Sequence, residues 1–118
     1  MDNFPIFLEI KNKPVLVIGG GDIAYRKIKL LIKSKPNIKV VAQNVCEEIL
    51  DLKEKYSIDI LKKEFHLDDI EFPIIIIAAT NNKLLNKQIA KEGLRKKIPV
   101  NVVDQPALCT FTMGSIVE

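Results

Sequence analysis

The stretch "VLVIGGGDIAYRKIKLLI", residues 15–32, places three consecutive glycines between an apolar, β-branched run and a segment with helical spacing. Val and Ile favour a strand before the glycines. Apolar side chains that recur about every three to four residues favour a helix after them. The residues that give this spacing are Ile23, Ala24, Ile28, Leu31 and Ile32. We therefore expect a strand, a tight turn and a helix in direct succession.

The glycines fit the pattern G-x-G-x-x-G/A through Gly19, Gly21 and Ala24. In that pattern the first glycine permits the turn, the second lets the backbone approach a pyrophosphate, and the small third residue allows close helix packing. The N–H groups at the start of the helix would then face the anion. This context predicts a dinucleotide site. The alternative is a glycine-rich turn that serves packing alone.

Strand-like and helix-like segments alternate through the rest of the chain. Strands are expected at residues 14–19, 38–42, 58–63, 73–80 and 98–104, and helices at 22–34, 45–55 and 82–97. The link at 64–72 has room for no more than a turn of helix. Such alternation predicts one doubly wound parallel sheet of the Rossmann type, an α/β fold with three α/β/α layers and strand order 3-2-1-4-5.

Composition narrows the class of protein. The 118 residues carry a formal net charge of +3, which is too mild to indicate nucleic acid but suits an anionic small molecule. No apolar run approaches the roughly 20 residues that span a bilayer, and the first residues lack the basic region of a signal peptide. Cys46 and Cys109 have no disulfide or zinc spacing. We expect a soluble cytoplasmic domain with no membrane segment and no metal site.

The acidic residue that usually binds the ribose hydroxyls after the second strand is absent. Gln43 and Asn44 stand there instead, and their amides can still hydrogen-bond a hydroxyl. Because neither a carboxylate nor an arginine occupies this place, charge does not decide between NAD and NADP. The alternative is that both residues only form a loop.

Three stretches together resemble the dinucleotide-binding domain of precorrin-2 dehydrogenases, which also forms the first part of siroheme synthases. They are "FPIFLEIKNKPVLVIGGGDIAYRKIKLLI", "IIIIAATNN" and "PVNVVDQPALCTF". The resemblance implies NAD-dependent oxidation of the tetrapyrrole precorrin-2 to sirohydrochlorin in siroheme biosynthesis. It also implies that the complete protein is a homodimer, and some members insert iron as well.

The resemblance also assigns residues to the cofactor. The glycine loop would contribute its backbone and first helical turn, Gln43 and Asn44 would contact the nucleotide, and the chain would pass beside the cofactor at Ala79 and Thr80. The loop residues are Gly19, Gly20, Gly21, Asp22 and Ile23.

Asp104 is the expected catalytic residue, as a general base. It ends the fifth predicted strand, and parallel strands direct their carboxyl ends toward the cofactor crevice. The alternative for Asp104 is a cap or turn before Pro106. Asn101 could orient the nicotinamide amide or satisfy the backbone at a strand end.

Members of that family continue into a helical part that pairs two subunits and helps to form the tetrapyrrole cleft. We therefore expect residues 1–113 to be the NAD-binding domain and 114–118 to begin the pairing segment, so that the chain alone would dehydrogenate poorly. A non-catalytic NAD-sensing module is the alternative function, and a methyltransferase ranks last.

The last expected helix could attract a carboxylate-rich substrate or simply present a solvated basic face. Its basic residues are Lys87, Lys91, Arg95, Lys96 and Lys97.

Overall fold

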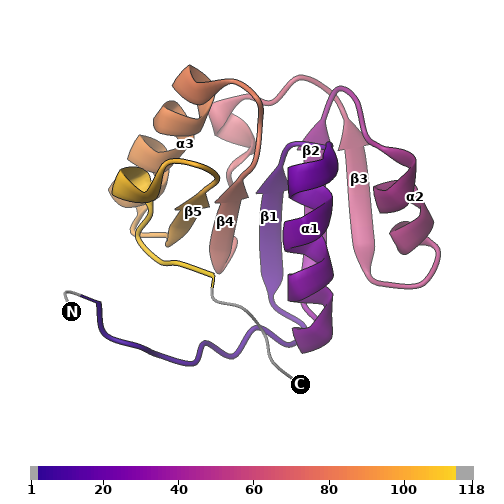
Figure 1. The fold of residues 1–118 in the computed structure, drawn as a ribbon, viewed down its shortest axis with the longest axis horizontal. Coiled ribbons are helices and arrows are strands. Elements are labelled where there is room, and N and C mark those ends of the chain that lie inside the picture. The colour runs from indigo at the N-terminus through magenta and orange to yellow at the C-terminus, as the bar shows by residue number, and fades with distance from the viewer. Residues whose placement is uncertain (1–2, 114–118) are drawn as a thin grey trace.

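The computed structural model describes residues 3–113, which form one parallel sheet with helices packed against it (Figure 1). The strands are β1 (Pro14–Ile18), β2 (Asn37–Ala42), β3 (Ile58–Lys62), β4 (Ile75–Ala78) and β5 (Val100–Val102), and the helices are α1 (Asp22–Leu31), α2 (Glu47–Lys53) and α3 (Lys83–Lys96). The order is β3-β2-β1-β4-β5, and every neighbouring pair is parallel. The predicted Rossmann-type order is confirmed.

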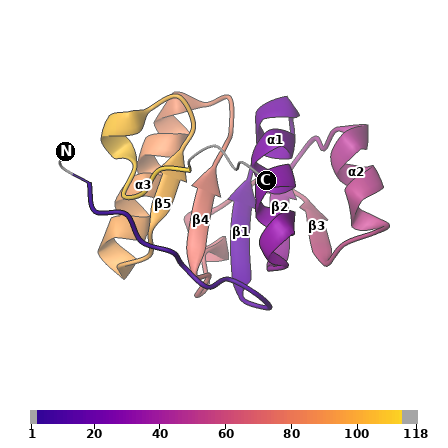
Figure 2. The same ribbon diagram turned by 60° about the horizontal axis from the view of Figure 1, so that its bottom comes forward.

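Both faces of the sheet are covered because the central strands are apolar at consecutive positions. Val15, Val17 and Val40 pack with Ile28 of α1 and Ile49 of α2. On the other face, Leu16, Ile18, Ile76 and Val100 pack with Ile89 of α3. Figure 2 shows the α1 and α2 ribbons over β1, β2 and β3, with α3 beside β4 and β5.

Two strands are each four residues shorter than their apolar runs predict. The fourth was expected to span 73–80 and the fifth 98–104, but β4 ends at Ala78 and β5 at Val102. Beyond β5 the chain turns, because Asp104 adopts a left-handed backbone with φ 58°. The link before β4 contains only a single 3-10 turn at Leu67–Asp69, as expected from its length.

One expectation for α1 is wrong. Ile23 has the right spacing for the apolar face, yet its side chain is 41% exposed, whereas Ala24 and Ile28 are buried. It lies in the first turn of the helix, immediately after the glycine loop. The neighbouring strand β1 has already ended at Ile18, before this turn of α1 begins.

The C-terminal segment closes the outer edge of β5. The Val100 N–H donates to the Thr110 hydroxyl at 2.7 Å, and the Thr110 N–H donates to the Val100 carbonyl at 2.9 Å. The Val102 N–H points at the Cys109 Sγ at 3.1 Å. These contacts satisfy backbone groups that an edge strand otherwise leaves open. No helix within residues 3–113 has the length and hydropathy to cross a bilayer.

Candidate functional site

The turn after β1 is closed by Gly19, which has a φ of 127°. This backbone conformation is unfavourable for residues with a Cβ. A Cβ on Gly19 would also overlap the Ala79 carbonyl oxygen of the loop after β4. The Gly19 N–H donates to the Val41 carbonyl of β2 at 3.0 Å. Gly19 is therefore held between the ends of both strands that flank β1.

Gly20 and Gly21 differ in what surrounds them. Gly20 is buried, and a Cβ there would overlap the Asn44 carbonyl oxygen, while its own carbonyl accepts from the Cys46 N–H at 2.8 Å. Gly21 is exposed, and apart from its chain neighbours no described atom would lie within 4 Å of a Cβ there. Gly19 and Gly20 therefore pack the loop against the loops after β4 and β2, whereas Gly21 leaves free space in front of α1.

That free space lies at the N-terminus of α1. Gly21 is the N-cap of α1, and no side chain in the described part of the chain caps the first turn. The first N–H groups of a helix have no acceptor within it and carry the positive end of the helix dipole. A pyrophosphate fits this position chemically. Asp22 in the same turn pairs with Arg26 at 3.0 Å, which offsets its charge.

Gln43 and Asn44 lie where the sequence places them, directly after β2 and beside the glycine loop. Both side chains are exposed. The Asn44 backbone lies against Gly20, and the exposed amides of both residues have the groups to donate to or accept from hydroxyls.

On the other side of the loop, Ala79 and Thr80 follow β4. The Ala79 N–H donates to the Ile18 carbonyl at 2.8 Å, which continues the sheet by one residue. Ala79 is buried and Thr80 half-buried. The structure thus brings together at one sheet edge the glycine loop, Gln43, Asn44, Ala79 and Thr80, all of which the sequence predicted to share a site.

Asp104 and Asn101 line a cavity of about 200 Å³ beyond the end of β5. The Asp104 side chain is exposed and, among residues 3–113, its carboxylate has no hydrogen-bond or ion-pair partner. The short 3-10 turn that follows, Pro106–Leu108, has Gln105 as its N-cap and receives no side-chain cap. Asp104 therefore turns the chain through its backbone, while its carboxylate stays available.

Asn101 is only 5% exposed, and its Nδ2 donates to the Phe111 carbonyl at 3.1 Å. That bond sets the amide orientation, because only the NH₂ group can donate to a carbonyl. Asn101 Oδ1 has no partner within the described residues. The Asn101 side chain thus pairs with a backbone carbonyl, which is one of the two roles expected for it. Its Oδ1 is an acceptor that a donor group of a ligand would pair with.

Sequence reasoning missed three residues near these loops. Lys27 of α1 and Gln105 line the same cavity as Asp104. Asn86 of α3 is buried and hydrogen-bonded to Thr80. The sequence does indicate that Asn86 is unusual, because it has the helical spacing of the buried Ile89 and Gly93 and is therefore a polar residue within an apolar stripe.

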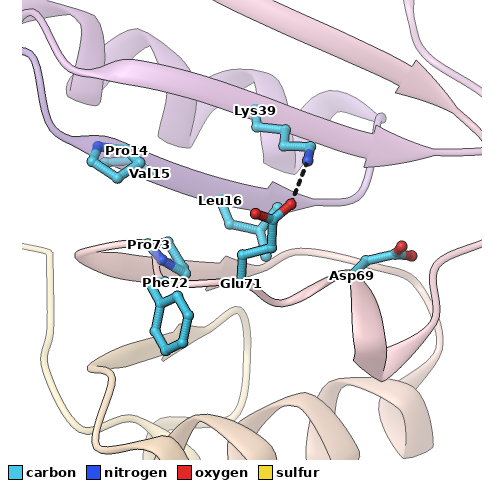
Figure 3. A pocket seen from close by; sticks show the side chains of 8 residues that line it. All are labelled: Pro14, Val15, Leu16, Lys39, Asp69, Glu71, Phe72 and Pro73. Carbon is cyan, nitrogen blue, oxygen red and sulfur yellow. Dashed lines mark ion pairs between the residues drawn. The ribbon is translucent and has the colours of Figure 1, made fainter.

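A second cavity, of about 250 Å³, lies at the opposite end of the strands (Figure 3). It is bounded by the start of β1, by Phe72 and Pro73 before β4, and by Lys39, which pairs with Glu71 at 3.7 Å. No predicted site residue lines it. Within residues 3–113, His, Cys, Asp and Glu side chains form no group of three that could hold a metal.

A parallel sheet of this order, with a glycine loop between β1 and α1, defines a dinucleotide-binding domain of the Rossmann type. The chain belongs to the family described as putative NAD(P)-binding, whose model matches residues 6–115.

Similar proteins cover the whole chain. The siroheme synthase of Ruthia magnifica subsp. Calyptogena magnifica is 46% identical over 118 residues, and that of Zymomonas mobilis subsp. mobilis is 42% identical over the same length. Both alignments cover 100% of this chain and 25% of the relative, so the chain spans about a quarter of their length. A solved structure of SirC, a precorrin-2 dehydrogenase, matches with a TM-score of 0.73 and 30% identity, covering 98% of this chain and 54% of that one.

Proposed function

We propose that this chain is the NAD-binding domain of a precorrin-2 dehydrogenase, which oxidises precorrin-2 to sirohydrochlorin in siroheme biosynthesis. The observation that carries the proposal is the Asp104 carboxylate, which has no partner among residues 3–113 and lines a cavity beyond β5, at the carboxyl edge of the sheet that also bears the glycine loop. The names of the relatives support the same reaction. Iron insertion by the complete protein is an extension of this proposal.

The residues present suit NAD as the cofactor. The space before Gly21 and the N-terminus of α1 would hold the pyrophosphate, Gln43 and Asn44 would hydrogen-bond a ribose, and Ala79 and Thr80 would form the wall beside the cofactor. Asn101 Oδ1 would accept from the carboxamide NH₂ of the nicotinamide. When bound, NAD accepts the hydride that leaves the tetrapyrrole.

Asp104 would take the proton that leaves with that hydride. A carboxylate acts as a general base when it lies within hydrogen-bond reach of the proton that it removes. The left-handed turn presents Asp104 at the cavity rather than along the strand. Lys27 in the same cavity brings a positive charge near the carboxylates of the substrate.

Residues 1–113 would form the NAD-binding unit, and further chain would pair two subunits and complete the tetrapyrrole cleft. The expected beginning of that pairing segment, 114–118, lies outside the described residues. The homodimer and the cytoplasmic location stay predictions.

The test is to replace Asp104 by Ala in a full-length protein that carries this domain. Sirohydrochlorin formation, followed by absorbance, should fall by at least about a hundredfold, as losing a positioned base does. The Kd for NAD should stay within about twofold, because the pyrophosphate and ribose contacts are intact. The 118-residue chain alone should bind NAD but turn over poorly. Full activity of the Asp104→Ala variant would show that Asp104 is not the base. If the full-length parent binds NAD but does not oxidise precorrin-2, the result favours a sensing module instead.

A further inference from the structure

Asn86 is a buried polar residue on the apolar face of α3. Its side chain is 2% exposed, and it shares that face with Ile89, Ala90 and Gly93. A buried amide is stable only when its donors and acceptors are paired. The partner that Asn86 finds is not in the sheet but in the loop after β4.

Within residues 3–113, a single residue, Thr80, supplies all the hydrogen-bond partners of the Asn86 side chain. The Thr80 N–H donates to Asn86 Oδ1 at 3.3 Å, and the Thr80 hydroxyl donates to the same oxygen at 2.5 Å. In return, Asn86 Nδ2 donates to the Thr80 carbonyl at 3.1 Å. The amide cannot be reversed, because only its NH₂ group can donate to that carbonyl. Asn86 therefore holds Thr80 at its N–H, its hydroxyl and its carbonyl.

The peptide that joins Ala79 to Thr80 lies against the glycine loop. A Cβ on Gly19 would overlap the Ala79 carbonyl oxygen and would lie 3.2 Å from the Thr80 nitrogen. The Ala79–Thr80 peptide is thus enclosed between Gly19 and Asn86. Displacement of this peptide toward the loop would push the Gly19 turn, and displacement away from it would leave a gap behind the turn.

The loop is attached to α3 at a second point. The Asn82 N–H donates to the Thr80 hydroxyl at 3.2 Å, and the Asn82 side chain caps α3 by accepting from the Leu85 N–H at 3.0 Å. The Asn82 cap places the start of the helix, while Asn86, one turn further on, places the peptide that contacts Gly19.

We propose that Asn86 is a positioning residue for the dinucleotide site: it holds the Ala79–Thr80 peptide against Gly19 and so sets the shape of the phosphate-binding turn. This inference rests on the proposed NAD-binding function. Because Asn86 is buried behind Thr80, it acts through that residue and does not touch the cofactor. Its loss should weaken NAD binding without slowing the chemical step.

Two substitutions test the inference on this chain. Asn86→Ala removes every bond to Thr80. Asn86→Asp keeps the acceptor for the Thr80 N–H and hydroxyl but replaces the donor by an oxygen that faces the Thr80 carbonyl. The matched control is Ile89→Ala, which opens the core beneath the same face of α3 but leaves the Thr80 contacts in place. The Kd for NAD is measured by calorimetry for all three, each below its own Tm.

Both Asn86 variants should raise the Kd for NAD by about tenfold or more, since Asn86→Ala leaves the partly buried Thr80 N–H and carbonyl without their partner and Asn86→Asp sets an oxygen against that carbonyl. Ile89→Ala should stay within about twofold despite its lower Tm. Amide exchange without NAD gives a second readout: the Thr80 N–H should lose protection in Asn86→Ala and keep it in Ile89→Ala. In a full-length enzyme, the Asn86 variants should raise the KM for NAD and leave kcat within about threefold.

A Kd within twofold of the parent in a folded Asn86 variant would overturn the inference, as would an equal loss of affinity in Ile89→Ala. If Asn86→Ala does not fold, Asn86→Asp decides. A parent chain that fails to bind NAD contradicts the proposed function itself, which is a different result.

Discussion

At the scale of single residues, three adjacent glycines serve three different purposes. Gly19 is needed for its backbone conformation and for contact with Ala79, and Gly20 for contact with the backbone at Asn44. Gly21 alone borders open space. The motif therefore combines two positions that the fold requires with one, Gly21, that the proposed NAD site would use, and only Gly21 should tolerate a side chain without harm to the fold.

Gly21→Asp should leave the domain folded and raise the Kd for NAD by at least about a hundredfold. The new carboxylate would stand at the anion position, where two unit charges about 4 Å apart repel by about 4 kcal/mol near a protein surface. Gly21→Ala is the control: its φ of −96° suits alanine, and the change should cost about tenfold or less. Calorimetry measures both values, and circular dichroism checks the fold. Unchanged affinity in a folded Gly21→Asp variant would show that NAD binds elsewhere.

At the scale of elements, α3 does not present the continuous basic face that its sequence suggests. Arg95 makes two bonds of 2.7 Å to the Glu92 carboxylate. Lys96 turns toward the link before β4, where its Nζ donates to the Ile70 carbonyl at 2.7 Å and lies 5.9 Å from the Phe72 ring centroid. Two of the expected cations thus have local roles, which favours the solvated-face interpretation over a substrate-attracting surface.

The link between β3 and β4 is held by Asp69. Its carboxylate accepts from Lys63 Nζ at 2.6 Å and from the His66 N–H at 2.8 Å. The hydrogen bond from Lys63, and after it the one from the His66 N–H, lower the pKa of Asp69 below its ordinary value of 3.8. The stability that these bonds contribute is therefore present above that ordinary value and lost as the pH falls through the lower folded-state pKa.

Asp69→Asn should lower the free energy of unfolding by about 1 kcal/mol at neutral pH, the usual contribution of a partly exposed capping and ion-pair contact. The difference from the parent should shrink toward zero in acid, once the parent carboxyl is protonated. Urea unfolding at several pH values measures it. Asp68→Asn is the matched control, because Asp68 is exposed and has no bond in the described part of the chain. A difference between Asp69→Asn and the parent that does not change with pH would contradict the assignment.

At the scale of the whole molecule, the sheet depends on the C-terminal segment as well as on its strands. The segment from Cys109 to Phe111 pairs with β5, and Phe111 and Met113 pack against the core on the α1 side. The same segment supplies part of the wall of the Asp104 cavity. The segment that closes the outer edge of the sheet therefore also forms part of the candidate site.

Thr110→Val should lower the free energy of unfolding by about 1–3 kcal/mol, because the buried Val100 N–H loses its acceptor while the shape of the side chain is kept. Thr110→Ser retains the hydroxyl and should lose less than half as much. Chemical unfolding of both variants gives the comparison. Equal stability of the valine variant and the parent would show that the hydroxyl does not close the edge.

The sequence by itself determined the order of elements and the end of the molecule at which the glycine loop lies. Apolar runs buried on both faces, helical spacing between them and a glycine turn at the first junction are local patterns, and a doubly wound parallel sheet accommodates all of them. The same patterns located Gln43 and Asn44, because they follow the second expected strand and parallel strands end at one edge. Ala79 and Thr80, which the patterns placed inside the expected strand 73–80, were assigned to the site by the family resemblance.

Only the tertiary structure decided which side chains meet across those junctions. The end of β5 at Val102, the left-handed turn at Asp104 and the approach of Lys27 to the same cavity depend on contacts between segments far apart in the chain. The hydrogen bonds between Asn86 and Thr80 depend likewise on how α3 packs against β4. Periodicity records which face of an element is buried, but it does not record the partner on that face. A partner is selected by the distance and direction between hydrogen-bonding groups, and these exist only once the layers have packed.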